Sequence, residues 1–220
     1  MRYLILLLSF WSVLAHAGND KKVTSLRLLG GIQHFPFDEA NAVINANGIA
    51  SMNKSYFLGV ELTRDVLGPL MFGFRFHQHY GTEREIAEPQ ADPLDEAYAS
   101  LNRKAYLGVA RLSVMRTRVA VLEVFGGVGG STSKLKVHTA AFDQSFERRE
   151  VNLTSITGVT FGVGFANIYI FGEVGQEWSK TDNLERTPGA STALTQFDTN
   201  GTWGSVGLLF NGIPSFVKMK

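Results

Sequence analysis

Beyond residue 22 the chain divides into segments of about ten residues in which apolar and polar side chains alternate. Alternation with a period of two is typical of a β-strand whose two faces meet different surroundings. Eight strands are expected, at 23–35, 54–65, 70–82, 102–115, 119–131, 151–165, 168–180 and 201–213. The pattern therefore predicts an all-β fold of eight strands.

The connections between these segments alternate in length. Short ones are expected at 66–69, 116–118 and 166–167, and long ones at 36–53, 83–101, 132–150 and 181–200. This alternation is typical of an antiparallel up-and-down transmembrane β-barrel, with tight periplasmic turns and longer outer loops. Residues that interrupt strands and favour turns, such as Pro36, Pro89 and Asn200-Gly201, lie in the long connections.

Each short turn predicts a register between the two strands that it joins. Turns centred on Gly68, on Thr117 and between 166 and 167 align apolar residues on one face of each hairpin. The expected apolar pairs are Val60 with Phe76, Leu62 with Phe74, Leu112 with Leu122, Ala110 with Val124, Val114 with Ala120, Val159 with Val174, Val163 with Ile170, and Phe165 with Ile168. On the opposite faces the expected pairs are Glu61 with Arg75, Arg111 with Glu123, and Thr160 with Glu173.

Five charged residues lie six or seven positions from their turn centres, namely Glu61, Arg75, Arg111, Glu123 and Glu173. In tilted strands that distance is roughly 15 Å above the periplasmic edge, near the middle of a bilayer. An Arg facing lipid at that depth would cost about 2–4 kcal/mol. The five are therefore expected to point into the lumen, pair with one another and close it.

The first 17 residues have the pattern of a secretory signal peptide. Arg2 precedes an apolar run over 3–14, and the small-x-small sequence Ala15-His16-Ala17 follows. The expected mature chain, 18–220, is one barrel domain. Without Arg2 it keeps 20 of the 21 basic residues against 20 acidic ones, so its charge indicates no nucleic-acid partner. It has no cysteine with which to form a disulfide.

Aromatic residues are expected to form two interfacial girdles, as transmembrane barrels require. The expected outer girdle contains Tyr56, Tyr106, Trp178 and Trp203, and the expected inner girdle contains Phe72, Phe165 and Phe210.

With these features, residues 22–213 resemble the OmpA/OmpX-type small outer-membrane β-barrels. The last strand, Trp203-Gly204-Ser205-Val206-Gly207-Leu208-Leu209-Phe210, looks like the assembly signal of that family. The resemblance implies an outer-membrane location in a Gram-negative-type cell, contact with membrane lipid and lipopolysaccharide, and insertion by the barrel-assembly machinery. It also implies a non-enzymatic envelope or surface-interaction protein, with at most a narrow channel.

The sequence assigns no catalytic residue, cofactor or metal site. His77 and His79 share a face of their strand and could hold a metal. Alternation along its own strand places His34 on the outward face, so it supplies no third ligand. Glu173 and Glu177 lie about 13 Å apart along a strand, too far for an acid/base pair. The acidic segment 83–100 is interpreted as a solvated loop.

Two alternatives remain open. A lipid A-modifying barrel would place His77, His79 or His138 beside a serine at the lipid-facing rim. A soluble, lipocalin-like ligand-binding barrel would invert the facing of the strands, with its apolar side inward.

Overall fold

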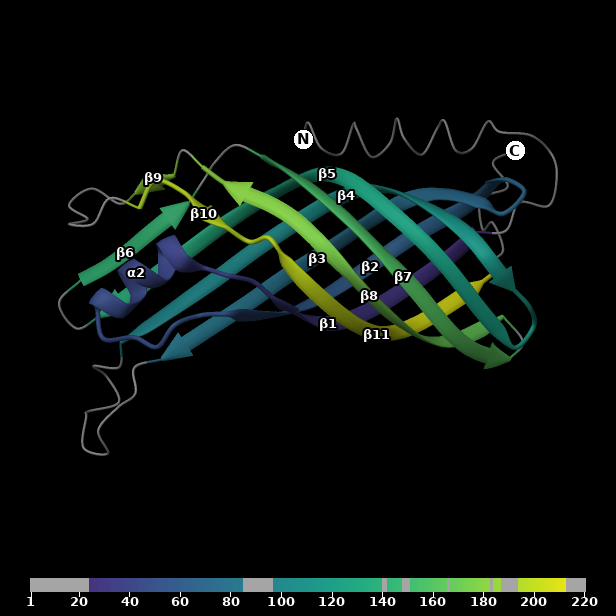
Figure 1. Cartoon of the computed structure of the whole chain (residues 1–220), viewed down its shortest axis with the longest axis horizontal. Helices are drawn as coiled ribbons and strands as arrows, with labels where there is room; N and C mark the ends of the chain where they lie inside the picture. Colours follow the sequence, from purple (N-terminus) through teal and green to yellow (C-terminus); the bar gives the residue numbers. More distant parts are fainter. Residues whose placement is uncertain are drawn as a thin grey trace, which may run out of the picture.

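Eight antiparallel strands form a closed ring (Figure 1). The computed structural model describes residues 24–84, 97–139, 142–147, 151–165, 167–182, 184–186 and 194–212. The ring contains β1 (Thr24–His34), β2 (Lys54–Leu67), β3 (Leu70–Arg84), β4 (Tyr98–Arg116), β5 (Ala120–Thr139), β7 (Asn152–Phe165), β8 (Ile168–Thr181) and β11 (Gly201–Asn211). Pairing of β1 with β11 closes it. The predicted eight-stranded barrel is confirmed, while the signal-peptide prediction for 1–17 lies outside the described residues.

The apolar face of the ring points outward. Leu58, Val174 and Val206 keep 65–70% of their surface exposed, although they lie in the middle of paired strands. The charged residues of the same strands are buried inside. A soluble barrel would have the opposite arrangement, so the soluble alternative is wrong and the geometry is that of a membrane-spanning barrel.

Two of the three predicted hairpin registers are confirmed. Glu61 lies opposite Arg75, and Thr160 lies opposite Glu173. Both turns contain a residue with positive φ, Gly68 at 54° and Asn167 at 74°. Glycine and asparagine are the residue types that adopt this conformation most readily.

The predicted register of the β4–β5 hairpin is wrong by two residues. The turn is centred between Arg118 and Val119 instead of on Thr117, so that Arg116 pairs with Val121. A bulge between Ser113 and Met115 then shifts the register back by one residue and places Leu112 opposite Val124 and Ser113 opposite Glu123. A bulge adds an unpaired residue to one strand, which a rule based on the turn centre alone does not include. Because the shift is even, each side chain keeps its predicted face.

The predicted long connections are more structured than expected. They contain α2 (Asp38–Ala46), β6 (Phe142–Glu147), β9 (Glu185–Arg186) and β10 (Phe197–Asp198), and both β4 and β5 extend well beyond their predicted outer ends. Figure 1 shows these added elements together at one end of the barrel. The helix has nine residues, and no helix among the described residues is long and apolar enough to span a membrane.

A separate hydrophobic core holds this end together, and we call the part of the protein built around it the cap. Ala40, Val43 and Ile44 form the buried face of α2, with the three- and four-residue spacing of an amphipathic helix. The core consists of Phe35, Phe37, Ala40, Val43, Ile44, Ile49, Met52, Ala97, Ala99, Leu101, Leu135, Val137, Phe146, Leu194 and Phe197. The outer end of the barrel is therefore covered by packed apolar side chains.

The aromatic girdles are only partly as predicted. Tyr56, Tyr106, Trp178 and Phe165 are exposed on the outer face, whereas Trp203 is buried in the lumen. The prediction for Trp203 considered its position along the strand and ignored which face of the strand its side chain occupies. Alternation puts it on the inward face, with Leu209 of the same strand.

Candidate functional site: the charged lumen and the buried histidine cluster

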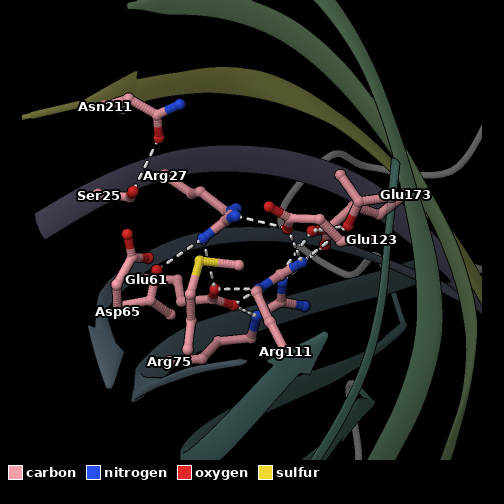
Figure 2. A network of polar contacts seen from close by, with 12 residues as sticks. Ser25, Arg27, Glu61, Asp65, Arg75, Arg111, Glu123, Glu173 and Asn211 are labelled. Carbon is pink, nitrogen blue, oxygen red and sulfur yellow. Dashed lines mark hydrogen bonds and ion pairs between the residues drawn. The ribbon is translucent and has the colours of Figure 1, made fainter. Parts of the chain in front are cut away.

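The structure brings all five predicted lumen charges together across the barrel (Figure 2). Glu61 accepts hydrogen bonds from Arg75 Nε at 2.6 Å and from Arg111 Nε at 2.5 Å. Glu173 accepts from Arg75 Nη2 and from Arg111 Nη2, both at 2.6 Å. Arg111 Nη1 lies 3.2 Å from Glu123. Their side chains are at most 1% exposed, so these ions depend on one another for stabilisation.

Three further charged residues belong to this cluster and were missed from the sequence. Arg27 contacts Glu61 at 3.1 Å and Glu123 at 2.6 Å. Arg116 contacts Glu123 at 2.9 Å and Asp65 at 3.4 Å. The eight side chains form the charge network: Arg27, Arg75, Arg111 and Arg116 with Glu61, Asp65, Glu123 and Glu173. Its formal charges balance.

Aromatic rings pack against the outer side of the charge network. The Arg111 guanidinium lies 4.2 Å from the ring centre of Phe125, and that of Arg75 lies 4.9 Å from it. Arg75 is also 5.6 Å from the ring of Trp203, which makes an edge contact with Phe57. Cation–π contacts of this kind are strongest where water is excluded. The lumen is therefore a mixed charged and aromatic interior, less uniformly polar than predicted.

A second polar cluster lies further toward the cap. His77 and His79 of β3 are buried and point inward, as predicted. Arg103 of β4 forms an ion pair with Glu177 of β8, and His77 Nε2 lies 3.9 Å from Glu177 Oε2. Ser55 Oγ is 3.2 Å from His79 Nδ1. Sequence reasoning dismissed Glu177 as an acid/base partner of Glu173 and did not anticipate that it meets the two histidines.

Hydroxyl groups line one side of this second cluster. Thr154 Oγ1 donates to Ser131 Oγ at 2.8 Å and lies 3.0 Å from Ser179 Oγ. Asn152 Nδ2 donates to Thr181 Oγ1 at 3.1 Å. These side chains come from β5, β7 and β8, so one wall of the outer lumen is lined by hydrogen-bonding groups.

A serine does lie beside a histidine, but not where lipid chemistry would need it. Ser55 and His79 are each about 1% exposed and face the lumen. Most of the acidic segment 83–100, residues 85–96, lies outside the described part of the chain.

Comparison with known proteins found no matching family model and no matching curated protein. Several solved structures are similar. Ail, the attachment invasion locus protein of Yersinia pestis, is 10% identical, with 86% of this chain and 97% of that chain covered and a TM-score of 0.46. The outer membrane protein OprG from Pseudomonas aeruginosa is 8% identical, with 86% and 94% covered and a TM-score of 0.48. The outer membrane protease OmpT from Escherichia coli is 8% identical, with 86% and 96% covered and a TM-score of 0.45.

The geometry of this chain identifies its fold. The strands close into a ring, apolar side chains cover its exterior, and arginine and glutamate fill its interior. This distribution suits a protein surrounded by lipid and is unfavourable for one surrounded by water. The chain is therefore an eight-stranded, antiparallel transmembrane β-barrel.

Proposed function

We propose that this protein is a closed, non-enzymatic outer-membrane barrel that strengthens the envelope and presents the cap for contacts outside the cell. The charge network carries the proposal. Its members come from β1, β2, β3, β4, β5 and β8, so ion pairs link strands on all sides of the ring. An eight-stranded barrel is just wide enough for side chains to fill it, which leaves little space for solute passage.

The layers above the network support a closed lumen as well. Phe125 and Trp203 lie over the arginines, and the apolar core of the cap covers the outer end. A diffusing ion would have to break buried ion pairs and then cross packed hydrocarbon. Both steps carry a large desolvation penalty.

Partners follow from the same proposal. The exposed apolar band would contact membrane lipid and, in the outer leaflet, lipopolysaccharide. The strand β11 would present its outward residues to the barrel-assembly machinery during insertion.

Conductance measurements test closure directly. Purified barrel in planar lipid bilayers is expected to give no steady open-pore current. The Arg75→Ala variant removes two ion pairs, to Glu61 and Glu173, and is expected to conduct measurably or to unfold more easily. Replacement of the exposed Arg118 by alanine is the matched control and should do neither. A steady current through the wild type, or wild-type behaviour of Arg75→Ala in both assays, would contradict the closed-lumen proposal.

The envelope role and the non-enzymatic assignment need separate assays. Deletion of the gene in the native host is expected to increase sensitivity to detergents, and the wild-type gene should restore resistance. Lipid A from the two strains should have identical masses. A change in lipid A mass that depends on Ser55 or His79 would instead support the lipid-modifying alternative.

A further inference from the structure

Three buried ligand-type side chains converge between the aromatic rings and the cap. His77 and His79 lie two residues apart on β3, so both imidazoles face the lumen. Glu177 reaches them from β8, which is separated from β3 by three strands in either direction around the ring. One nitrogen from each histidine and one oxygen of Glu177 all lie within 4.8 Å of one another. The third ligand that sequence reasoning could not find therefore comes from the opposite wall.

The two histidines each leave a buried nitrogen without a hydrogen bond. Among the described residues, neither His77 Nε2 nor His79 Nε2 has a hydrogen-bond partner, although both side chains are buried. Buried polar atoms are rarely left unsatisfied in native proteins, and such atoms commonly hold a water or an ion. Here both unsatisfied nitrogens belong to histidines of the group that also contains Glu177, and His77 Nε2 lies 3.9 Å from Glu177 Oε2.

Neighbouring groups hold these side chains in orientations suited to ligation. Ser55 Oγ lies 3.2 Å from His79 Nδ1, which leaves Nε2 as the free nitrogen of that ring. Arg103 binds Oε1 of Glu177, and the other oxygen, Oε2, is the one that lies nearest His77. Hydrogen bonds from outer groups to ligating histidines and carboxylates are a regular feature of metal sites.

We propose that His77, His79 and Glu177 bind one divalent first-row transition-metal ion of the Zn²⁺ type in the outer lumen. Two imidazoles and one carboxylate suit zinc and its neighbours, whereas Ca²⁺ and Mg²⁺ prefer oxygen ligands. Zinc bonds of about 2.0–2.2 Å in tetrahedral geometry bring ligand atoms to about 3.3 Å from one another. Small rotations that draw the three side chains toward a common centre would achieve this separation.

The charge of Arg103 limits which ions the site accepts. Its guanidinium neutralises much of the Glu177 charge, so a cation held only by electrostatic attraction gains little. Binding then depends on bonds to imidazole nitrogen, which favours Zn²⁺, Co²⁺, Ni²⁺ or Cu²⁺ over hard ions. A bound ion would connect β3 to β8 through the lumen and leave one coordination position for water.

Metal analysis of the refolded, untagged mature chain tests the proposal. Zn²⁺ is present during refolding in detergent so that the cap does not limit its entry, and loosely bound ion is removed by dialysis. We expect about one Zn²⁺ per wild-type chain, and a decrease in affinity of at least tenfold in His77→Asn and His79→Asn. Substitution by Co²⁺ should give the visible absorption of a nitrogen-ligated ion in the wild type, and this signal should be lost in both variants.

Two controls make the result decisive. His34→Asn removes an exposed histidine that lies outside the cluster, and it should bind as the wild type does. Heat-dependent migration on a gel identifies variants that have folded, and only these are scored. The Glu177→Gln variant tests the third ligand, but it also leaves Arg103 without its carboxylate partner. If this variant does not fold, the two histidine variants alone test the proposal. Equal zinc content in the folded wild type and both histidine variants, or none in the wild type, would overturn the proposal.

Discussion

Arg111 is the most extensively paired side chain of the lumen. It contacts Glu61, Glu123 and Glu173, and its Nη1 also donates to Thr160 Oγ1 at 2.8 Å. A planar guanidinium with five N–H donors can serve several carboxylates at once, which an ammonium group cannot do with the same geometry. The arrangement makes one arginine the common partner of the three glutamates of the charge network.

Replacement of Arg111 by methionine should therefore be severely destabilising. The side chain keeps a similar length, but three buried carboxylates lose a positive partner, and breaking buried pairs typically costs about 3–5 kcal/mol. Arg118→Met, at an exposed position in the β4–β5 turn, should stay within about 0.5 kcal/mol of the wild type. Urea unfolding in lipid vesicles measures both. Equal free energies of unfolding for the two variants would contradict the assignment of Arg111 as the centre of the network.

Alternation along a strand was enough to predict which way most charged residues point. It could not predict that Arg27 lies opposite Glu61, because the long connection between β1 and β2 fixes no register. The same limit hid the meeting of His77 with Glu177 across the lumen. Contacts between strands on opposite walls depend on the closure of the whole ring, which no local sequence rule contains.

The cap is an independent hydrophobic unit on top of the barrel. Its core shares no residue with the apolar cluster of the lumen, which contains Leu29, Phe57, Leu107, Val109, Val121, Phe125, Ile156, Tyr169, Phe171, Trp203 and Leu209. Separate clusters allow local opening of one without loss of the other. Damage to the cap should therefore leave the barrel folded.

A charge introduced on α2 tests this independence. Ile44 is fully buried in the cap core, whereas Ala42 is on the exposed face of the same helix. Ile44→Asp should increase the rate of limited proteolysis within 36–53 by at least tenfold, which corresponds to about 1.4 kcal/mol of local stability. Ala42→Asp should leave the cleavage rate nearly unchanged. Loss of the heat-dependent gel shift in Ile44→Asp would show that the cap and the barrel unfold together.

Elements joined by tight turns were more predictable than those joined by long connections. The β2–β3 and β7–β8 hairpins follow from the positions of Gly68 and Asn167, since a two-stranded register is determined locally. The helix α2 was missed because nine residues within an apparent loop give a weak periodic signal. Its buried residues, Ala40, Val43 and Ile44, do have the three- and four-residue spacing of a helix. The sequence therefore contained a helical signal, but the strand pattern of the rest of the chain favoured reading this segment as a loop.

The whole molecule is an inside-out arrangement that only lipid makes favourable. In water, exposed Val and Leu on most strands would be a large apolar surface without a partner. In a bilayer the same surface meets hydrocarbon, and closure of the ring lets the strands pair their backbone donors and acceptors without a free edge. Stability therefore belongs to the protein and the membrane together.

One substitution placed at two depths measures this dependence. Val174 lies on the outward face beside Glu173, near mid-height, whereas Val119 lies in the β4–β5 turn at the end of the barrel opposite the cap. The two side chains are similarly exposed, at 65% and 60%. In lipid vesicles, Val174→Arg should lower the free energy of unfolding by about 2–4 kcal/mol, and Val119→Arg by about 0–1 kcal/mol. A water-facing barrel would tolerate both changes equally, because surface substitutions usually shift stability by no more than about 0.5 kcal/mol. Equal changes in the free energy of unfolding at the two depths would mean that the outer face does not lie in hydrocarbon. A difference of the expected size would instead locate Val174 at the bilayer centre, with the charge network at the same height inside the barrel.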